Sequence, residues 1–290
     1  MPGLVEEIPL AFPCLGETLI GMLHQPAAPA SVGVVVVVGG PQYRAGSHRQ
    51  FILLARALAA QGAAVLRFDC RGMGDSDGTF AGFELIEPDI AAAVDALMAR
   101  IPSLRHVILW GLCDAVLAIA EHARRDPRIA GVVLLNPWVR SESGLAKAQL
   151  KHYYLARLLQ PDFFRKVLRG EFNPFESGRA LLANLARAFG SRGSGASAAG
   201  SGVAANSLAE QLVNELRRFK GRILLILSGR DLTAKEFEDA ARASAAWRAL
   251  LAEARVTRRE LAAADHTFSR ATWRDQVAAW TWEWVEEAAP

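Results

Sequence analysis

The sequence predicts an α/β fold in which a mostly parallel sheet is flanked by helices. Two observations carry this prediction. Strand-like apolar segments alternate with helical patterns between residues 34 and 135. The β-branched run 34–38 is also continuous rather than alternating, which is typical of a strand buried on both faces of a parallel sheet. Right-handed crossovers would then place the connecting helices on both faces of that sheet.

The first half of the chain contains a predicted hairpin followed by alternating strands and helices. The hairpin is expected to turn at 15–17. The helix after the first buried strand is expected to begin at Ser47, acting as its N-cap. We expect strands at 7–12, 18–23, 34–38, 64–68, 107–110 and 131–135, and helices at 47–58, 83–100 and 115–122.

The alternation stops after Pro137 and resumes near residue 222. Residues 138–220 contain helical patterns without a strand signal, and the stretch near 191–202 has the Gly, Ser and Ala composition of a flexible linker. We interpret 138–220 as a helical cap insertion, and 1–137 with 221–290 as the α/β core. The remaining expected elements are strands at 222–228 and 256–261, a long helix at 233–253, and a last helix carrying Trp273, Trp280 and Trp284.

Composition and charge are those of a soluble globular protein with an ample core. The 290 residues are 51% hydrophobic, and their net charge of +3 is too small to indicate a nucleic-acid partner. No apolar run approaches the roughly 18 residues of a membrane span, and the N-terminus lacks the pattern of a signal peptide. Three cysteines without metal-ligand spacing predict neither a disulfide framework nor a metal site. We therefore expect a cytoplasmic protein without a cofactor, and leave its oligomeric state open.

The segment 106–115 carries the most specific chemical signal in the chain. An apolar strand ends in Gly111-Leu112-Cys113-Asp114-Ala115, and a helical pattern begins at once. This is the pattern of a nucleophile elbow, in which small residues two before and two after the nucleophile let the backbones approach closely. The helix N-terminus would stabilise a thiolate of Cys113, whereas the Asp114 carboxylate would oppose it. The alternative is a buried structural cysteine at a strand end.

Two further residues with suitable chemistry follow other predicted strands. Asp231 and His266 come after the strands at 222–228 and 256–261, and ligands of an open α/β sheet bind beyond the carboxyl ends of its strands. Together with Cys113 they form the order nucleophile, acid, histidine. Alternatives remain for each residue. Asp231 could be a helix N-cap, His266 a surface histidine, and Asp265 the acid in place of Asp231.

The chain resembles the α/β-hydrolase superfamily over nearly its full length and, more narrowly, the type 1 exosortase A system-associated hydrolases. The blocks that carry the resemblance are GGPQYR at 39–44, GSHRQF at 46–51, RFDCRGMGDS at 67–76 and WGLCDA at 110–115. Asp231 and His266 match the acid and base positions of the superfamily. The resemblance implies an α/β-hydrolase fold with a helical cap, a Cys113–His266–Asp231 triad, and a bacterial setting alongside exopolysaccharide synthesis and exosortase-dependent sorting.

The segment after the 34–38 strand departs from the superfamily. Most α/β-hydrolases have His-Gly there, and a backbone N–H of that segment completes the oxyanion hole. This chain has Gly39-Gly40-Pro41, and Pro41 has no N–H to donate. We expect the backbone N–H groups of Gln42 and Asp114 to form the hole.

The sequence therefore predicts a hydrolase that cleaves an ester, thioester or lactone-type acyl bond with a cysteine nucleophile. Tyr43 and Arg44 are expected near the mouth of the site as substrate-binding residues, and the substrate is expected to be a small molecule or a lipid or sugar acyl group. Two alternatives stay open. The acyl group could pass to a sugar acceptor, or the protein could be a non-catalytic binding module on the same fold.

Overall fold

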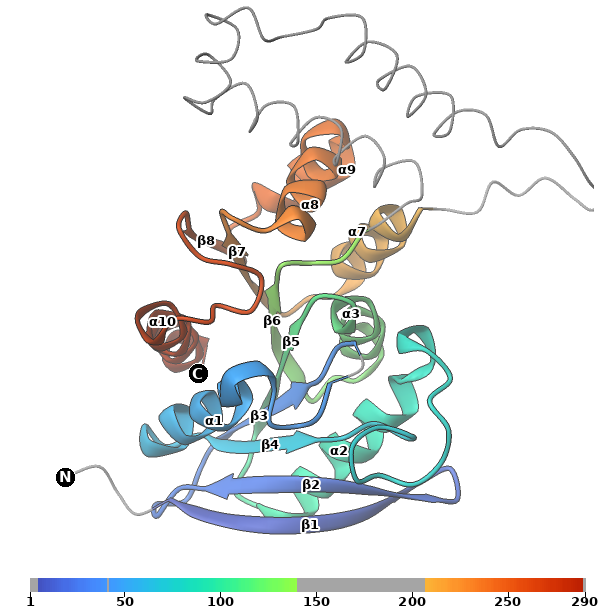
Figure 1. Cartoon of the computed structure of the whole chain (residues 1–290), viewed down its shortest axis with the longest axis vertical. Coiled ribbons are helices and arrows are strands. Elements are labelled where there is room, and N and C mark those ends of the chain that lie inside the picture. Colours follow the sequence, from blue (N-terminus) through green and yellow to red (C-terminus); the bar gives the residue numbers. More distant parts are fainter. Residues whose placement is uncertain (1–4, 41, 140–206, 289–290) are drawn as a thin grey trace, which may run out of the picture. The chain divides into compact units, whose positions relative to one another are not determined.

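The computed structural model describes residues 5–40, 42–139 and 207–288 (Figure 1). The chain divides into two units, Met1–Arg140 with Ser207–Pro290, and Ser141–Asn206. The second unit lies outside the described residues, as do the linker expected near 191–202 and most of the expected cap. The first unit includes helix α7, Leu208–Arg218, although its residues fall within the predicted insertion at 138–220.

Within the described residues, one sheet of eight strands forms the centre of the first unit (Figure 1). Its spatial order is β1-β2-β4-β3-β5-β6-β7-β8. The β1–β2 and β2–β4 pairs are antiparallel, and every pair from β4 to β8 is parallel, as the sequence predicted. The strands are β1 Glu6–Cys14, β2 Glu17–Gln25, β3 Val32–Val37, β4 Ala64–Phe68, β5 His106–Leu112, β6 Ile129–Leu135, β7 Arg222–Ser228 and β8 Val256–Leu261.

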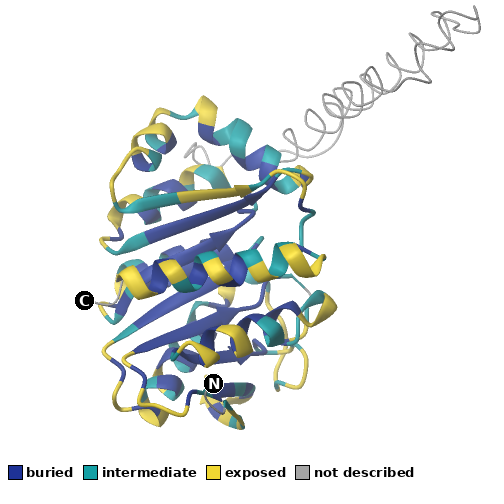
Figure 2. Ribbon diagram, turned by 90° about the vertical axis from the view of Figure 1, so that its left-hand side faces the viewer, coloured by how far each residue is buried: buried dark blue, intermediate teal, exposed yellow. Residues whose placement is uncertain are grey.

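Helices cover both faces of the sheet. One face packs against α1 and α10, and the other against α2, α3 and α7, with α8 and α9 beside β7 and β8 (Figure 1). Figure 2 shows the strands as a dark blue layer beneath helices whose outward faces are yellow. The helices are α1 Gln50–Ala60, α2 Glu87–Arg100, α3 Ala115–Arg125, α7 Leu208–Arg218, α8 Leu232–Ala243, α9 Ala245–Leu251 and α10 Ala271–Ala288.

The core on each face of the sheet is apolar and closely packed. All six residues of β3 are buried, which is why a continuous β-branched run suits this position. On the α1 side, Phe51 packs edge-on against Trp110 with ring centroids 5.7 Å apart. On the other side, Phe237 packs edge-on against Trp247 at 4.9 Å. Burial of side chains of this size stabilises the fold by about 2 kcal/mol each.

Two helices begin or end differently from the expectation. Helix α1 begins at Gln50, because Ser47 starts a short 3-10 turn without capping and Arg49 adopts a left-handed conformation. The long helix expected over 233–253 is two helices, since Ser244 is extended and its hydroxyl accepts a hydrogen bond from the backbone N–H of Trp247 at 3.4 Å, capping α9.

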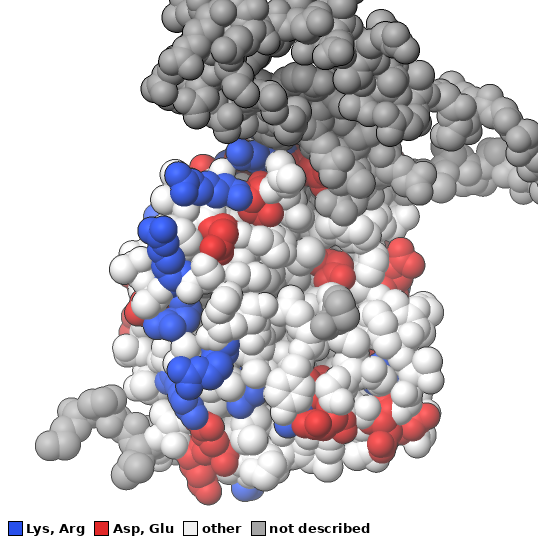
Figure 3. All heavy atoms as spheres, in the orientation of Figure 1, with Lys and Arg blue, Asp and Glu red and all other residues white. Residues whose placement is uncertain are grey.

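The surface in the orientation of Figure 1 is uncharged over much of its middle, with Lys and Arg gathered along the left-hand edge, and with Asp and Glu partly among them and partly on the right and lower right (Figure 3). Several exposed arginines pair with carboxylates, including Arg56 with Glu7, Arg222 with Glu287 and Arg258 with Glu238. Among the helices that the structure describes, none combines the length and apolarity needed to cross a membrane.

Candidate active site

Cys113 occupies the tip of a sharp turn between β5 and α3. Its φ of 65° lies in the left-handed region, which is uncommon for a residue with a side chain. The backbone around it is held by β6 and the segment that follows: the N–H of Cys113 donates to the carbonyl of Leu135 at 2.9 Å, and its carbonyl accepts from the N–H of Trp138 at 3.2 Å. The side chain is half-buried. This backbone strain is consistent with a functional position, since such strain persists where the surrounding structure enforces it.

Small residues around Cys113 are required by the packing of the turn. A Cβ at Gly111 would overlap the side chain of Ile119 and would lie 3.3 Å from the Cβ of Ala115. A Cβ at Gly39, in the segment after β3, would overlap the Asp114 carboxylate and the Leu112 carbonyl. The close approach predicted for a nucleophile elbow is therefore present on both sides of Cys113.

His266 lies in the segment between β8 and α10 and pairs with Asp231 at the end of β7. The imidazole Nδ1 and the Asp231 Oδ2 are 2.8 Å apart. The Asp231 side chain is buried, whereas that of His266 keeps 32% of its surface exposed. Because Nδ1 faces Asp231, Nε2 is the nitrogen available to Cys113.

The surroundings of His266 favour its charged form. Burial lowers the pKa of the imidazole, but hydrogen bonds to Asp231 and to Cys113 outweigh burial and raise that pKa to about 10. The negative charges of the carboxylate and of a thiolate act in the same direction. The structure therefore brings together Cys113, His266 and Asp231 from three separate strand ends, in an arrangement that supports a thiolate–imidazolium pair.

Asp231 is both the partner of His266 and the N-cap of α8. Its two carboxylate oxygens accept hydrogen bonds from the N–H groups of Thr233 and Ala234, each at 3.1 Å. The helix-cap interpretation and the triad interpretation therefore do not compete, because the cap fixes the carboxylate that faces His266. Asp265 is turned to Ser269 instead, whose N–H donates to it at 3.0 Å and whose hydroxyl also bonds to it.

The segment after β3 lies against Asp114. The N–H of Gln42, expected in the oxyanion hole, instead donates to the Gly40 carbonyl at 2.8 Å. The Asp114 carboxyl lies beside Gly39 and Gly40, and its Oδ1 is buried without a hydrogen-bond partner among the described residues. Burial raises the pKa of this carboxyl, against the opposing effect of the N–H groups of Gly40, Asp114 and Ala115 and of the His266 charge.

Tyr43 and Arg44 belong to a network with the segment after β4. The Arg44 guanidinium pairs with Asp69 and with Asp75, the latter at 2.8 Å, and the Arg44 N–H donates to Asp69 at 2.6 Å. The Tyr43 hydroxyl donates to Asp75 at 3.1 Å, and its side chain is 44% exposed. Arg44 is thus engaged in holding two loops together, while Tyr43 keeps an exposed ring.

Sequence reasoning missed Asn136, which follows β6 and is fully buried. Its Nδ2 donates to the carbonyl of His266, and its Oδ1 accepts from the N–H of Ser228, both at 2.9 Å. The signal available in the sequence was a polar residue directly after a buried strand, in the run Leu134-Leu135-Asn136-Pro137.

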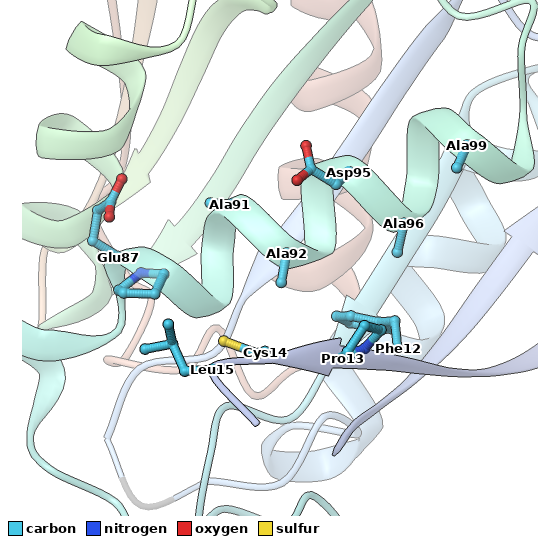
Figure 4. A pocket seen from close by; sticks show the side chains of 11 residues that line it. Phe12, Pro13, Cys14, Leu15, Glu87, Ala91, Ala92, Asp95, Ala96 and Ala99 are labelled. Atoms are coloured by element: carbon cyan, nitrogen blue, oxygen red, sulfur yellow. The ribbon is translucent and has the colours of Figure 1, made fainter. Parts of the chain in front are cut away.

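A surface groove of about 590 Å³ lies elsewhere, between β1 and α2 (Figure 4). It is lined by the end of β1, including Cys14, and by the alanine-rich face of α2, and it contains none of the triad residues. Burial raises the pKa of the Cys14 thiol, with the Asp89 charge acting in the same direction. No group of three or more His, Cys, Asp or Glu in the described part of the chain could hold a metal ion.

Comparison with known proteins agrees with this fold. The family described as serine aminopeptidase, S33, matches residues 29–267. No curated protein matches the sequence. Similar solved structures include the esterase Pf2001 of Pyrococcus furiosus, at 15% identity and a TM-score of 0.65, covering 98% of this chain and 91% of that one.

Two further esterase structures are similar. Est1E from Butyrivibrio proteoclasticus, determined with ferulic acid, has 15% identity and a TM-score of 0.61, covering 96% of this chain and 98% of that one. The esterase domain of a Rhodothermus marinus protein has 18% identity and a TM-score of 0.59, covering 98% and 100%. These identities show the fold alone. With the family match, they identify an α/β-hydrolase fold.

Proposed function

The chain belongs to the serine aminopeptidase S33 family of α/β-hydrolases, and on that premise we propose that it is an acyl hydrolase whose nucleophile is Cys113. The family match and the esterase-like fold support a hydrolase. The observation that carries the finer proposal is the placement of His266, whose Nδ1 lies 2.8 Å from Asp231 and whose pKa is raised by both Asp231 and Cys113. A thiol takes the place that serine usually occupies in this fold.

In the first half of the reaction, the Cys113 thiolate attacks the carbonyl carbon of the substrate. The carbonyl electron pair moves onto oxygen, giving a tetrahedral oxyanion. As that intermediate collapses, His266 donates its proton to the leaving oxygen or sulfur, and an acyl-cysteine remains. The raised pKa of His266 keeps the proton on the imidazole at neutral pH until the leaving group needs it.

In the second half, a water molecule attacks the acyl-cysteine. His266, now neutral, accepts the water proton, the carbon–sulfur bond breaks, and the acid product leaves with the thiolate restored. Asp231 orients the imidazole through Nδ1 and stabilises its cationic form in both halves.

The N–H of Asp114 at the start of α3 is the proposed first donor to the oxyanion, since a nucleophile elbow places this N–H at the hole. For the second donor we propose Gly40 in place of Gln42, because the Gln42 N–H is held by the Gly40 carbonyl within its own turn. The N–H groups of Gly40 and Asp114 both interact with the Asp114 carboxyl, so we propose that this side chain turns away from them when the oxyanion forms.

The proposed substrate class is an activated acyl group, such as a thioester, a lactone or an aryl ester. A thiolate is a weaker base than an alkoxide, so it is expelled readily from the tetrahedral intermediate unless the leaving group also departs easily. The exposed ring of Tyr43 is the proposed substrate contact, with Arg44 fixing its loop. The cytoplasmic setting is a proposal from the cysteine usage, and the three unpaired thiols agree with a reducing compartment. The link to exopolysaccharide and exosortase systems is a proposal from the sequence resemblance.

The experiment is a screen of the purified protein with p-nitrophenyl esters and acyl thioesters, beside the Cys113→Ala variant. Turnover that depends on Cys113, together with a trapped acyl-cysteine of the expected mass, would support the proposal. The competing function is a binding module, favoured by the Asp114 carboxyl beside the hole. Binding of an acyl compound without turnover or acylation would support that alternative and contradict hydrolysis.

A further inference from the structure

The segment 135–138, at the end of β6, hydrogen-bonds to the turn that carries the nucleophile and to β7. Leu135 and Trp138 hold the backbone of Cys113 on its N–H and carbonyl sides, at 2.9 and 3.2 Å. Between them, the N–H of Asn136 donates to the carbonyl of Ile226 in β7, at 3.1 Å. The segment 135–138 is therefore attached both to the elbow and to β7, the strand that precedes Asp231.

The side chain of Asn136 also bonds to the segment between β8 and α10, which carries His266. Its Nδ2 donates to the His266 carbonyl and its Oδ1 accepts from the Ser228 N–H, both at 2.9 Å. The two partners fix which end of the amide is which, because one is a carbonyl and the other an N–H. In the described part of the chain no other hydrogen bond reaches the main chain of His266.

Few residue types could fill this position. The backbone of Asn136 has a φ of 42°, in the left-handed region where Asn is tolerated better than most residues. The side chain is fully buried, so both of its polar ends must be satisfied within the protein. Asparagine tolerates the left-handed backbone and carries one donor for the His266 carbonyl and one acceptor for the Ser228 N–H.

We propose that Asn136 is a positioning residue for the reaction proposed above: its amide ties the main chain of His266 to the end of β7 and so holds the imidazole between Asp231 and Cys113. This inference rests on the proposed function for its effect on turnover, but not for its effect on His266. Because no other hydrogen bond holds the main chain of His266 in the described part of the chain, loss of the amide would let the imidazole move away from Asp231 and Cys113.

The predicted effect on rate follows from the tolerance of catalytic geometry. A displacement of about 1 Å at a reacting group costs about 100-fold in rate. We expect this loss in kcat, with little change in KM. Asn136 is buried, bonds to the main chain of His266, and has no part in the proposed substrate contact at Tyr43.

Two variants separate the side chain from the backbone. Asn136→Gly keeps the left-handed conformation and removes both hydrogen bonds. Asn136→Asp keeps the size and the acceptor for Ser228 but replaces the donor to the His266 carbonyl with a carboxylate oxygen. The matched control is Thr281→Val, which removes another fully buried hydrogen bond, that of Trp110 Nε1 to Thr281 Oγ1 at 3.4 Å, on α10.

The first measurement is the NMR titration of the His266 imidazole in each protein. The wild type and Thr281→Val should share a pKa well above the ordinary value of about 6.5, and both Asn136 variants should move it toward that value. The second is the pH profile of Cys113 alkylation, where loss of the pair should lower the rate at about pH 6.5 by up to 100-fold, because an ordinary thiol is then only about 1% ionised.

Unchanged His266 titration and unchanged alkylation in both Asn136 variants would overturn the inference, even if the variants were less stable. A wild type without turnover but with a shifted His266 pKa that the variants lose would contradict the proposed function and keep the inference. Equal losses in Thr281→Val would show that any buried defect has this effect, and would also overturn it.

Discussion

Cys113 and Cys70 both lie just beyond the carboxyl end of a parallel strand, and their surroundings differ in every respect that governs thiol chemistry. Cys113 follows β5 with a left-handed backbone, a half-buried side chain and an imidazole bonded to it. Cys70 follows β4 and is 3% exposed; burial raises its pKa, and the charges of Asp89 and Asp69 raise it further.

The loops around the two cysteines differ in the same way. Around Cys70 the polar groups are satisfied: Asp69 accepts from the N–H of Arg44 and from its guanidinium, and Arg71 bonds to Asp89 through two nitrogens. Beside Cys113 a buried carboxylate oxygen of Asp114 has no partner among the described residues. A strand end thus makes a cysteine available for chemistry only when the turn exposes it and a cation faces it.

The largest expected effect comes from replacing each of the two cysteines with alanine in turn. Cys113→Ala should reduce hydrolysis of an aryl ester by about 10⁴-fold or more, because loss of a nucleophile removes the covalent route. Cys70→Ala should leave kcat/KM within about 3-fold and lower stability by about 1 kcal/mol, as a truncated buried side chain does. Steady-state kinetics measure the change in kcat/KM, and urea unfolding measures the change in stability, for both variants. Comparable activity losses in the two variants would contradict the assignment of Cys113 alone as the nucleophile.

The next effect concerns the acid that faces His266. Asp231→Asn should lower kcat by roughly 10³-fold, since an amide cannot stabilise the imidazolium and favours the wrong tautomer. Asp265→Asn is the matched control, because Asp265 bonds to Ser269 and not to the imidazole. A larger loss in the Asp265 variant would assign the acid to that residue instead.

A third change tests the hydrogen-bond network of Asp69 and Arg44 beside Cys70. Asp69→Asn leaves the Arg44 guanidinium without its buried carboxylate and should cost about 3 kcal/mol in the free energy of unfolding. The pH profile of Cys113 alkylation should not change, because this network shares no hydrogen bond with the triad. A shift in that profile would show that the two regions are coupled.

A fourth expected effect is on stability as a function of pH. The pKa of His266 is raised to about 10 in the folded protein. Its contribution to stability is therefore fully present below the unfolded value of about 6.5, and is lost as pH rises from there through about 10. His266→Gln should flatten this part of the stability curve in urea unfolding between these limits, and an unchanged slope would contradict the raised pKa.

The fold could be predicted from the sequence because buried parallel strands have a strong signature. The runs at 34–38 and 222–228 are apolar on every residue or nearly so, and only a sheet covered on both faces buries such runs. The positions of Cys113, Asp231 and His266 after predicted strands led to the expectation that they meet at one edge of the sheet, and Asp231 and His266 are 2.8 Å apart there. Their contact follows from sheet topology, since β5, β6, β7 and β8 are consecutive neighbours.

The sequence could not predict features that depend on the paths of loops. The turn that binds the Gln42 N–H to the Gly40 carbonyl is set by local dihedral angles. The break at Ser244 replaces a helical pattern that continues through it, because its extended backbone overrides the periodicity. The Asn136 side chain hydrogen-bonds to residues 92 and 130 positions away along the chain, and no local sequence pattern predicts such contacts.

The most direct test of the central claim is alkylation of Cys113 by iodoacetamide as a function of pH, in the wild type and in His266→Ala, followed by mass spectrometry. Cys14 and Cys70 in the same sample are internal controls, since burial raises the pKa of both thiols. We predict rapid labelling of Cys113 well below the ordinary thiol pKa of about 8.5, slowed in His266→Ala. Labelling of Cys113 no faster than that of the two buried cysteines, in both proteins, would contradict a thiolate held by His266.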